Sequence, residues 1–331
     1  MTDYSNIIPE TDVNNSGPLI KKRYIRLFIF FIGMSVVFTV TRCAVIFTFV
    51  EPNTGLYAVT SGILPHILDY IVYAFVIVCV ICSRVVYKKA YAFENVQGTP
   101  SCLFTSVLCG FMLLAMFVLQ LLGYFDMFSH NGYSIIVTAK DIFKNNLLEF
   151  ILVILSFPCA MYFFKSISRS STGRLSEQII PAAIARKKET IYSIFSFTPI
   201  IWLVLRLAIC FFDTAQLVNT SGHKLELLML VALVLFFLAD ARMIIGDTAA
   251  SPLFFFGFAA IFMVGVSAVP NLILSSIWLL KTRTTLIIYT VEIAFMAYAA
   301  AKLYSQLRHA SYSDYEDENI KEARIALKKN L

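Results

Sequence analysis

Two arginines lie well inside long apolar runs of this 331-residue sequence. Arg42 follows the stretch LFIFFIGMSVVFTVT, and Arg206 follows IYSIFSFTPIIWLVL. A cation inside hydrocarbon costs roughly 2.5 to 3.5 kcal/mol on insertion scales, so each should have a charged partner or line a wet cavity. These residues therefore predict ion pairing or solute binding inside a membrane.

Acidic side chains occur at similar depths in other apolar runs. From a helical rise of about 1.5 Å per residue, Arg42 and Glu292 lie about 12 Å from the predicted outer ends of their helices. Asp69 and Arg206 lie about 9 Å from those ends, and Glu226 about 3 to 5 Å. We predict a polar layer in the outer half of the membrane, formed mainly by Arg42, Asp69, Arg206 and Glu292.

Three of these charges have polar neighbours at helical spacing, which places each set on one helix face. Three helices would then each present a polar stripe, and the stripes could face one another. The neighbours are Ser35 and Thr39 beside Arg42, His66 and Tyr73 beside Asp69, and Tyr289 beside Glu292.

The polar layer has two interpretations. In the first, it lines an outward-facing cavity that binds a small charged or zwitterionic solute. The arginines would then meet a carboxylate or phosphate, while Asp69 or Glu292 would meet a cation. In the second, the arginines are neutralised by Asp69, Glu226 and Glu292, and the pairs only lock the bundle.

A second candidate lies near the inner end of the sixth run, in FFLADARMIIG. Asp240 and Arg242 are two positions apart, about 200° around a helix, so they do not pair with each other. We expect Arg242 to reach the cytoplasmic interface. Asp240 either pairs with Arg84 or gates a passage.

Most signatures of enzymes and metal sites are absent from the sequence. It has no phosphate-binding glycine loop, no His-Glu-x-x-His motif and no Gly-x-Ser-x-Gly elbow. Cys79 and Cys82 form a C-x-x-C, but within the apolar stretch VIVCVICSRVV. All seven cysteines lie in apolar segments, so we expect free thiols. We expect no enzyme activity, no cofactor and no bound metal.

Composition places the chain in the membrane class, because 59% of its residues are hydrophobic and 15% charged. Eight apolar runs are long enough to cross a hydrocarbon core of roughly 30 Å. We predict an all-α integral membrane protein, an eight-helix transmembrane bundle embedded in the lipid bilayer. After Pro270 the apolar pattern either extends the seventh helix or lies in the interface. The predicted spans are Leu27–Val50, Ile63–Val86, Cys102–Phe125, Asn146–Phe164, Thr190–Phe212, Lys224–Gly246, Pro252–Val269 and Thr284–Leu303.

The basic residues predict the orientation, because cytoplasmic segments are enriched in lysine and arginine. With a cytoplasmic N-terminus, twenty of the 27 fall inside, Lys302 among them, and five fall outside. We therefore predict that both termini are cytoplasmic, and we interpret the net charge of +6 as topogenic, with no nucleic-acid partner. The predicted segments are a polar N-terminus (1–20), helices one to four (21–168), a basic loop (169–189), helices five to eight (190–304) and a tail (305–331).

The two halves of the chain resemble each other weakly. Arg42 and Arg206 occupy matching places in the first and fifth runs, and the second and sixth runs each open with a carboxylate and end with an arginine. Such a pattern is consistent with a 4+4 parallel repeat, which often places a site at its interface. Chance similarity among apolar helices is the alternative.

The stretches RLAICFFD and FFLADARMIIG resemble sequences in an uncharacterised group of multi-pass membrane proteins from Gram-positive bacteria. The resemblance covers Phe195–Gly246 and brings no activity with it. It implies a bacterial plasma membrane, in which the Asn219 sequon would not be glycosylated.

Two classes of function follow from these features. The first is a transporter or solute-binding membrane protein that uses the outer polar layer. The second is a non-enzymatic sensor or scaffold subunit, in which the layer is purely structural and a protein partner binds the basic 165–189 loop.

Overall fold

The computed structural model describes residues 10–50, 63–88, 90–92, 99–130, 147–172, 192–212, 221–245, 250–278, 283–309 and 311–312. Long helices account for nearly all of them. These are α1 (Glu10–Phe49), α2 (Leu64–Lys88), α3 (Pro100–His130), α5 (Leu147–Thr172), α7 (Thr198–Phe212), α8 (Ser221–Ile245), α9 (Ala250–Trp278) and α10 (Arg283–His309).

Within this described part of the chain, eight helices are long and apolar enough to cross a membrane, which confirms the predicted number of spans. Their side chains fit that environment, since large apolar groups such as Phe30 on α1 and Phe104 on α3 are exposed. An exposed apolar surface of this extent suits contact with lipid tails. The chain is a multi-pass membrane protein.

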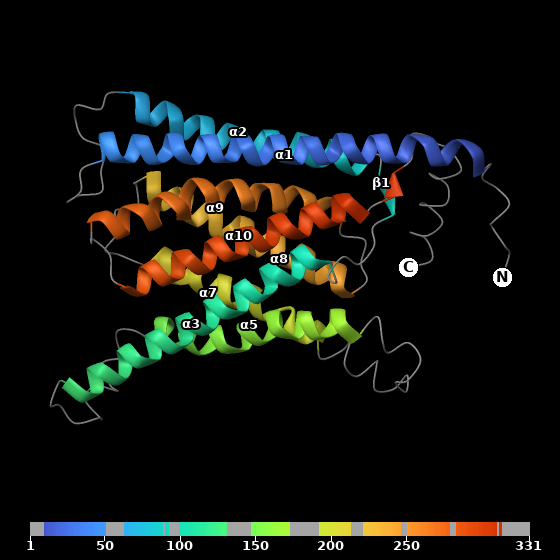
Figure 1. Cartoon of the computed structure of the whole chain (residues 1–331). Helices are drawn as coiled ribbons and strands as arrows, with labels where there is room; N and C mark the ends of the chain where they lie inside the picture. Colours follow the sequence, from blue (N-terminus) through green and yellow to red (C-terminus); the bar gives the residue numbers. More distant parts are fainter. Residues whose placement is uncertain are drawn as a thin grey trace.

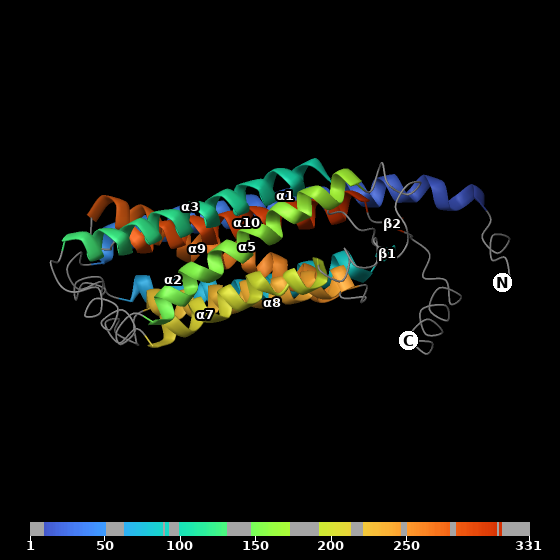
Figure 2. The ribbon, with the colours of Figure 1, turned by 90° about the horizontal axis from the view of Figure 1, so that it is seen from below.

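Six of the helices pack in a closed ring. Going round it, each helix contacts the next in the order α9, α10, α3, α5, α7, α8, and α8 returns to α9. The pair α1 and α2 lies outside this ring against α9, at the opposite side of the bundle from α5 (Figures 1 and 2). Helix α9 is therefore covered on several sides, and most of its apolar side chains are buried.

Aromatic side chains hold the outer pair of helices to α9. Phe75 of α2 stacks on Phe262 of α9 with ring centroids 4.1 Å apart, and Phe31 of α1 meets Phe258 of α9 edge-on at 4.7 Å. Such ring pairs add about 0.5 to 1.5 kcal/mol each beyond the area they bury. They position α1 and α2 on the ring without a large direct contact between these two helices.

Glycine permits a close approach inside the ring. A Cβ atom on Gly257 of α9 would lie 2.8 Å from Leu303 Cδ1 of α10. Small residues at helix interfaces in membranes let backbones approach and gain packing contacts. Gly257 therefore sets the separation of α9 and α10 near the C-terminal end of α10.

A small antiparallel ribbon lies beyond the helices. The strands β1 (Ala90–Ala92) and β2 (Ser311–Tyr312) follow α2 and α10, with Ala90 opposite Tyr312 and Ala92 opposite Ser311. The start of α1 and the end of α10 lie at this same end of the bundle (Figure 1). An even number of spans brings the chain back to the side on which it started.

The structure changes several predicted boundaries. Helix α9 continues through Pro270 to Trp278, so the apolar segment after this proline extends the helix. Helix α1 begins at Glu10, within the predicted polar N-terminal segment 1–20. Helix α10 runs to His309, past the predicted end of the last span.

Helix contacts do not show the 4+4 repeat. In such a repeat, α1 and α2 would be equivalent to α7 and α8. However, α7 and α8 belong to the ring, whereas α1 and α2 lie outside it. The Asn219 sequon and most of the 165–189 loop, like the tail after Tyr312, lie outside the described residues.

Candidate functional site

A buried ionic triad joins three helices of the ring. Arg206 on α7 contacts Glu226 on α8, with Nη2 2.5 Å from Oε1, and Glu292 on α10, with Nε 3.4 Å from Oε1. Their exposed fractions are 7% for Arg206, 2% for Glu226 and 0% for Glu292. We call these three residues the triad.

The sequence of α7 explains why Arg206 points into the ring. Its buried residues recur at helical spacing on one face, so the arginine shares the inward face. These are Pro199, Trp202, Leu203, Arg206 and Cys210. On α10 the buried neighbours Tyr289 and Phe295 lie three positions on either side of Glu292, which directs that carboxylate inward as well.

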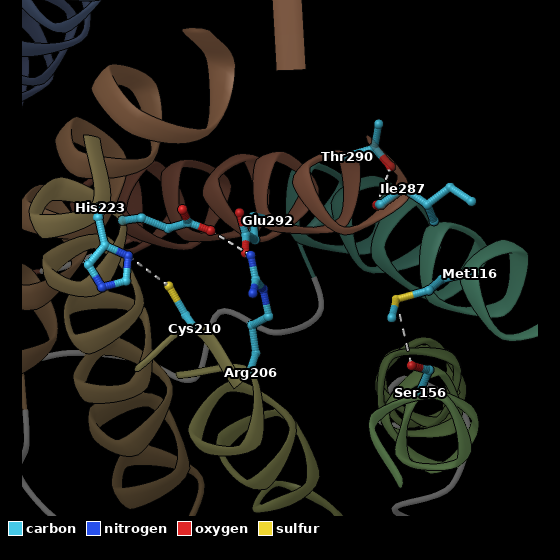
Figure 3. Close-up of polar contacts among 9 residues, drawn as sticks. Met116, Ser156, Arg206, Cys210, His223, Ile287, Thr290 and Glu292 are labelled. Carbon is cyan, nitrogen blue, oxygen red and sulfur yellow. Dashed lines mark hydrogen bonds and ion pairs between the residues drawn. The ribbon is translucent and has the colours of Figure 1, made fainter. Parts of the chain in front are cut away.

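Three further titratable side chains lie beside the triad. His223 on α8 faces Cys210 on α7, with 3.9 Å between Nδ1 and Sγ. Figure 3 shows both next to Arg206, which extends towards Glu292. Tyr289 is fully buried one turn before Glu292 and interacts electrostatically with Glu226 and Arg206. The polar cluster is therefore larger than the three ion-paired groups.

The other predicted arginine belongs to a different ion pair. Arg42 Nη1 on α1 contacts Asp69 Oδ1 on α2, and both side chains are buried. The sequence predicts one layer shared by Arg42, Asp69, Arg206 and Glu292, but the ion pairs divide these residues into two groups. One group links α1 to α2 outside the ring, and the other lies within the ring.

The predicted polar stripes of α1, α2 and α10 do not face one another as one group. Ser35 and Thr39 donate to carbonyl oxygens of their own helix, those of Phe31 and Ser35, at 3.0 and 2.9 Å. Such bonds satisfy a hydroxyl inside an apolar helix. His66 is exposed and Tyr73 is partly buried, whereas Tyr289 lies at the triad.

Near the C-terminal ends of α8 and α10 lies a second buried cluster. Lys302 Nζ of α10 lies 3.0 Å from Asp240 Oδ1 of α8, and Tyr298 donates a hydrogen bond of 2.9 Å to the other carboxylate oxygen. We call these three residues the inner cluster. Asp240 thus has a lysine partner, and the predicted pairing with Arg84 is wrong, because Arg84 is exposed.

Sequence reasoning missed Lys302 because a lysine near the end of an apolar run usually reaches the aqueous interface. The prediction counted it among the cytoplasmic residues, but it is buried within α10. One signal was present: Phe295, Tyr298 and Lys302 recur at i, i+3 and i+7, the spacing of a buried helix face. Arg242 is exposed near the C-terminal end of α8.

Aromatic rings fill the space between the triad and the inner cluster. Phe295 lies three residues after Glu292 on α10, with its ring 5.1 Å from Phe237 of α8 and 5.6 Å from Trp202 of α7. Trp202 donates a hydrogen bond of 2.9 Å to Ser156 on α5. The ring interior therefore alternates from a charged level through an aromatic level to a second charged level.

In the described segments, no group of three His, Cys, Asp or Glu residues could hold a metal ion. The seven cysteines are free thiols, as the sequence predicts, and these include Cys79 and Cys82 of the C-x-x-C. The chemistry available to the triad is that of a guanidinium and two carboxyl groups.

No protein-family model, curated protein or solved structure matches this chain. No residue role is therefore carried over from another protein.

Proposed function

We propose that the protein binds and transports a small charged or zwitterionic solute, and that the triad is where the charged part of the solute binds. The observation that supports this is the charge of the triad. Arg206 faces two carboxyl groups, so one guanidinium is shared by two acidic side chains. A cationic group of a solute would share these carboxyl groups with Arg206.

A purely structural role would need only a balanced ion pair. The Arg42–Asp69 pair links two helices with one charge of each sign, and the inner cluster does the same with Asp240 and Lys302. A balanced pair avoids the large penalty of an unpaired buried ion. The extra carboxylate of the triad adds to that penalty, so its presence favours a role beyond locking the bundle.

The arrangement of the ring is also suited to transport. Charged levels near the two ends of α8 and α10 are separated by the rings of Trp202, Phe237 and Phe295. Transporters commonly bind substrate between parts of a bundle that open alternately to each side. In this proposal the aromatic level separates the solute at the triad from the opposite side of the membrane.

The proposed setting is a bacterial plasma membrane with both termini in the cytoplasm, which the distribution of lysine and arginine supports. The protein is proposed to act without catalysis. The competing proposal is a sensor or scaffold subunit in which the triad is structural, and the following experiment separates the two.

The test is a thermal-stability screen of the purified protein in detergent against alkali cations, amines and amino acids. We expect at least one cationic or zwitterionic solute to raise the Tm of the wild type. Glu226→Gln should abolish that shift, because it removes one of the two carboxyl groups that would hold the cationic group of the solute. Glu149→Gln, on the exposed start of α5, is the matched control and should keep it.

Two arginine variants refine the test. Arg206→Gln should abolish the solute effect, whereas Arg42→Gln should keep it, since Arg42 pairs with Asp69 outside the ring. If no solute in the panel stabilises the wild type and Arg206→Gln only lowers the yield of folded protein, the structural interpretation replaces the proposal.

A further inference from the structure

Helix α1 carries an exposed stripe on the face turned away from the ring. The opposite face packs on α9 through Phe28 and Phe31. The residues of the stripe recur at intervals of four and three, which is the spacing of one helix face, and all of them are exposed. We call this set the α1 stripe, and it consists of Lys22, Arg26, Ile29, Gly33, Val36 and Val40.

The α1 stripe is basic where the helix enters the membrane and apolar beyond that point. The part of α1 that could cross a membrane begins at Lys22. Ile29, Val36 and Val40 are 61%, 56% and 62% exposed. No atom lies within 4 Å of a Cβ built at Gly33, so the middle of the stripe is low and open. The cations therefore lie at the level of lipid headgroups, and the apolar residues lie alongside acyl chains.

Further exposed cations lie around the start of the stripe. Arg23 follows Lys22 directly, and Arg84 lies near the end of α2. Phe31 of α1 meets Phe75 of α2 with ring centroids 5.7 Å apart, and the two helices run in opposite directions (Figure 1). The start of α1 and the end of α2 therefore lie at the same end of the bundle.

Carboxylates are scarce around this group of cations. The sequence has no acidic residue between Asp12 and Glu51, so α1 offers none beside the stripe. Where α1 starts and α10 finishes, the nearest halves of the described spans hold one carboxylate, Asp240, which is buried on Lys302. The exposed surface of the described spans at this end therefore complements a negatively charged ligand.

We propose that the α1 stripe binds an acidic phospholipid, with its phosphate at Lys22 and Arg26 and an acyl chain along the apolar part of the stripe. Lysine and arginine form charge-assisted contacts with phosphate. Basic residues directly beside a membrane span are a pattern that binds acidic lipids. The stripe offers both parts of such a lipid a contact on one helix face. The site lies outside the ring, so it is independent of the proposed solute site.

A role in orientation alone would not require this arrangement. Orientation depends on the number of basic residues beside a span, whichever helix face they occupy. Lipid binding depends on the face, because the phosphate and the acyl chain belong to one molecule. The position of Arg26, one turn after Lys22 and directly before the exposed apolar residues, is what the proposal explains.

Lipid titration of the purified full-length protein in detergent, followed by native mass spectrometry, tests the proposal. We expect phosphatidylglycerol to bind more tightly than phosphatidylcholine with the same acyl chains. The double variant Lys22→Gln with Arg26→Gln should bind phosphatidylglycerol about 30-fold more weakly, since each cation near the surface contributes about 1 kcal/mol. Raising the salt concentration from about 0.1 to about 1 M should also weaken binding to the wild type, because it screens the charges.

Two matched variants separate the stripe from net charge. Lys224→Gln removes an exposed cation at the start of α8, at the other end of the bundle, and should leave the affinity unchanged. The swap Ile25→Arg with Arg26→Ile keeps the composition but moves one cation about 100° round the helix. This swap should weaken phosphatidylglycerol binding about fivefold, because one of the two cations leaves the stripe.

Two competing ligands provide further tests. Inorganic phosphate should not displace the lipid, because it has no acyl chain. The acidic residues after β2 are another possible occupant, since β2 contacts α1. Neutralising them in the full chain should leave lipid binding unchanged. These residues are Asp314, Glu316, Asp317 and Glu318.

Several results would overturn the proposal. These are equal affinity for the two lipids, unchanged phosphatidylglycerol binding in the double variant, or displacement of the lipid by inorganic phosphate. Preferential binding that occurs only after the acidic residues are neutralised would show that the tail occupies the stripe instead. If the double variant does not fold, an unchanged affinity in the swap variant overturns the proposal.

Discussion

The triad and the inner cluster lie on the same two helices, α8 and α10, and both are buried, yet they differ in charge balance. In the inner cluster, Asp240 meets one lysine, and Tyr298 donates to its second oxygen. In the triad, one arginine is shared by two carboxyl groups at unequal distances. The inner cluster joins one carboxylate to one cation, whereas the triad places two carboxyl groups on one arginine.

This difference teaches that burial of charge in a membrane bundle is not by itself evidence of function. Intramembrane ionisable residues face the bundle interior and pair with one another in structural and functional sites alike. The informative property is the sum of the charges within contact. By this criterion the triad is the functional candidate, and the inner cluster is a structural link between α8 and α10.

The largest effect on stability is expected from a substitution that breaks the inner cluster. Lys302→Met keeps the length of the side chain but leaves the Asp240 carboxylate buried without its cation. We expect the free energy of unfolding to fall by about 3 to 5 kcal/mol, the range for removing one partner of a buried pair. Denaturant unfolding in mixed micelles measures it.

The double variant Asp240→Asn with Lys302→Met is the matched control for this prediction. Because it removes both charges, we expect it to recover much of the lost stability. A double variant no more stable than Lys302→Met would mean that the lysine acts through packing and not through its charge.

A packing change near the inner cluster should have a smaller effect. Gly257→Ala places a Cβ 2.8 Å from Leu303 Cδ1, next to Lys302, so that side chain or α10 must shift. Overpacking of this kind costs about 1 to 3 kcal/mol. If the inner cluster depends on this close approach, the loss in Gly257→Ala should be less than additive with that in Lys302→Met.

Gly33→Ala provides the comparison, because no atom lies within 4 Å of a Cβ built at that position on α1. Alanine favours the helix over glycine by up to about 1 kcal/mol, so this variant should be as stable as the wild type or slightly more stable. Equal destabilisation by both alanines would contradict the role given to Gly257.

The spans were predictable from the sequence because the number of apolar residues needed to cross a bilayer depends on local composition alone. The grouping of Arg206 with Glu226 and Glu292 was also within reach as one of two interpretations, since helical rise places all three in the outer half. The ring itself was not predictable. Lipid tails are as apolar as leucine, so apolar patterning does not say which helix faces contact protein.

That limit explains the two main errors at the candidate site. The single layer of four residues assumed that α1 and α2 meet α7 and α10 around one site, but α1 and α2 pack outside the ring, mainly on α9, with a smaller contact of α1 on α10. Lys302 was assigned to the cytoplasmic side because lysine near a helix end usually extends to water. Both errors concern which neighbour a helix face meets, which is a tertiary property.

The smallest expected effect comes from the triad, and it is the sharpest comparison with Lys302→Met. Glutamine has nearly the shape of a glutamate side chain, so Glu292→Gln removes the more distant of the two carboxyl groups around Arg206 with little change in packing. The Arg206–Glu226 contact then remains a balanced pair. We expect a change of less than about 1 kcal/mol in the free energy of unfolding, since a typical hydrogen bond contributes about that much. A loss as large as that of Lys302→Met would show that Glu292 is ionised and paired in the wild type, and the two clusters would then be alike in kind.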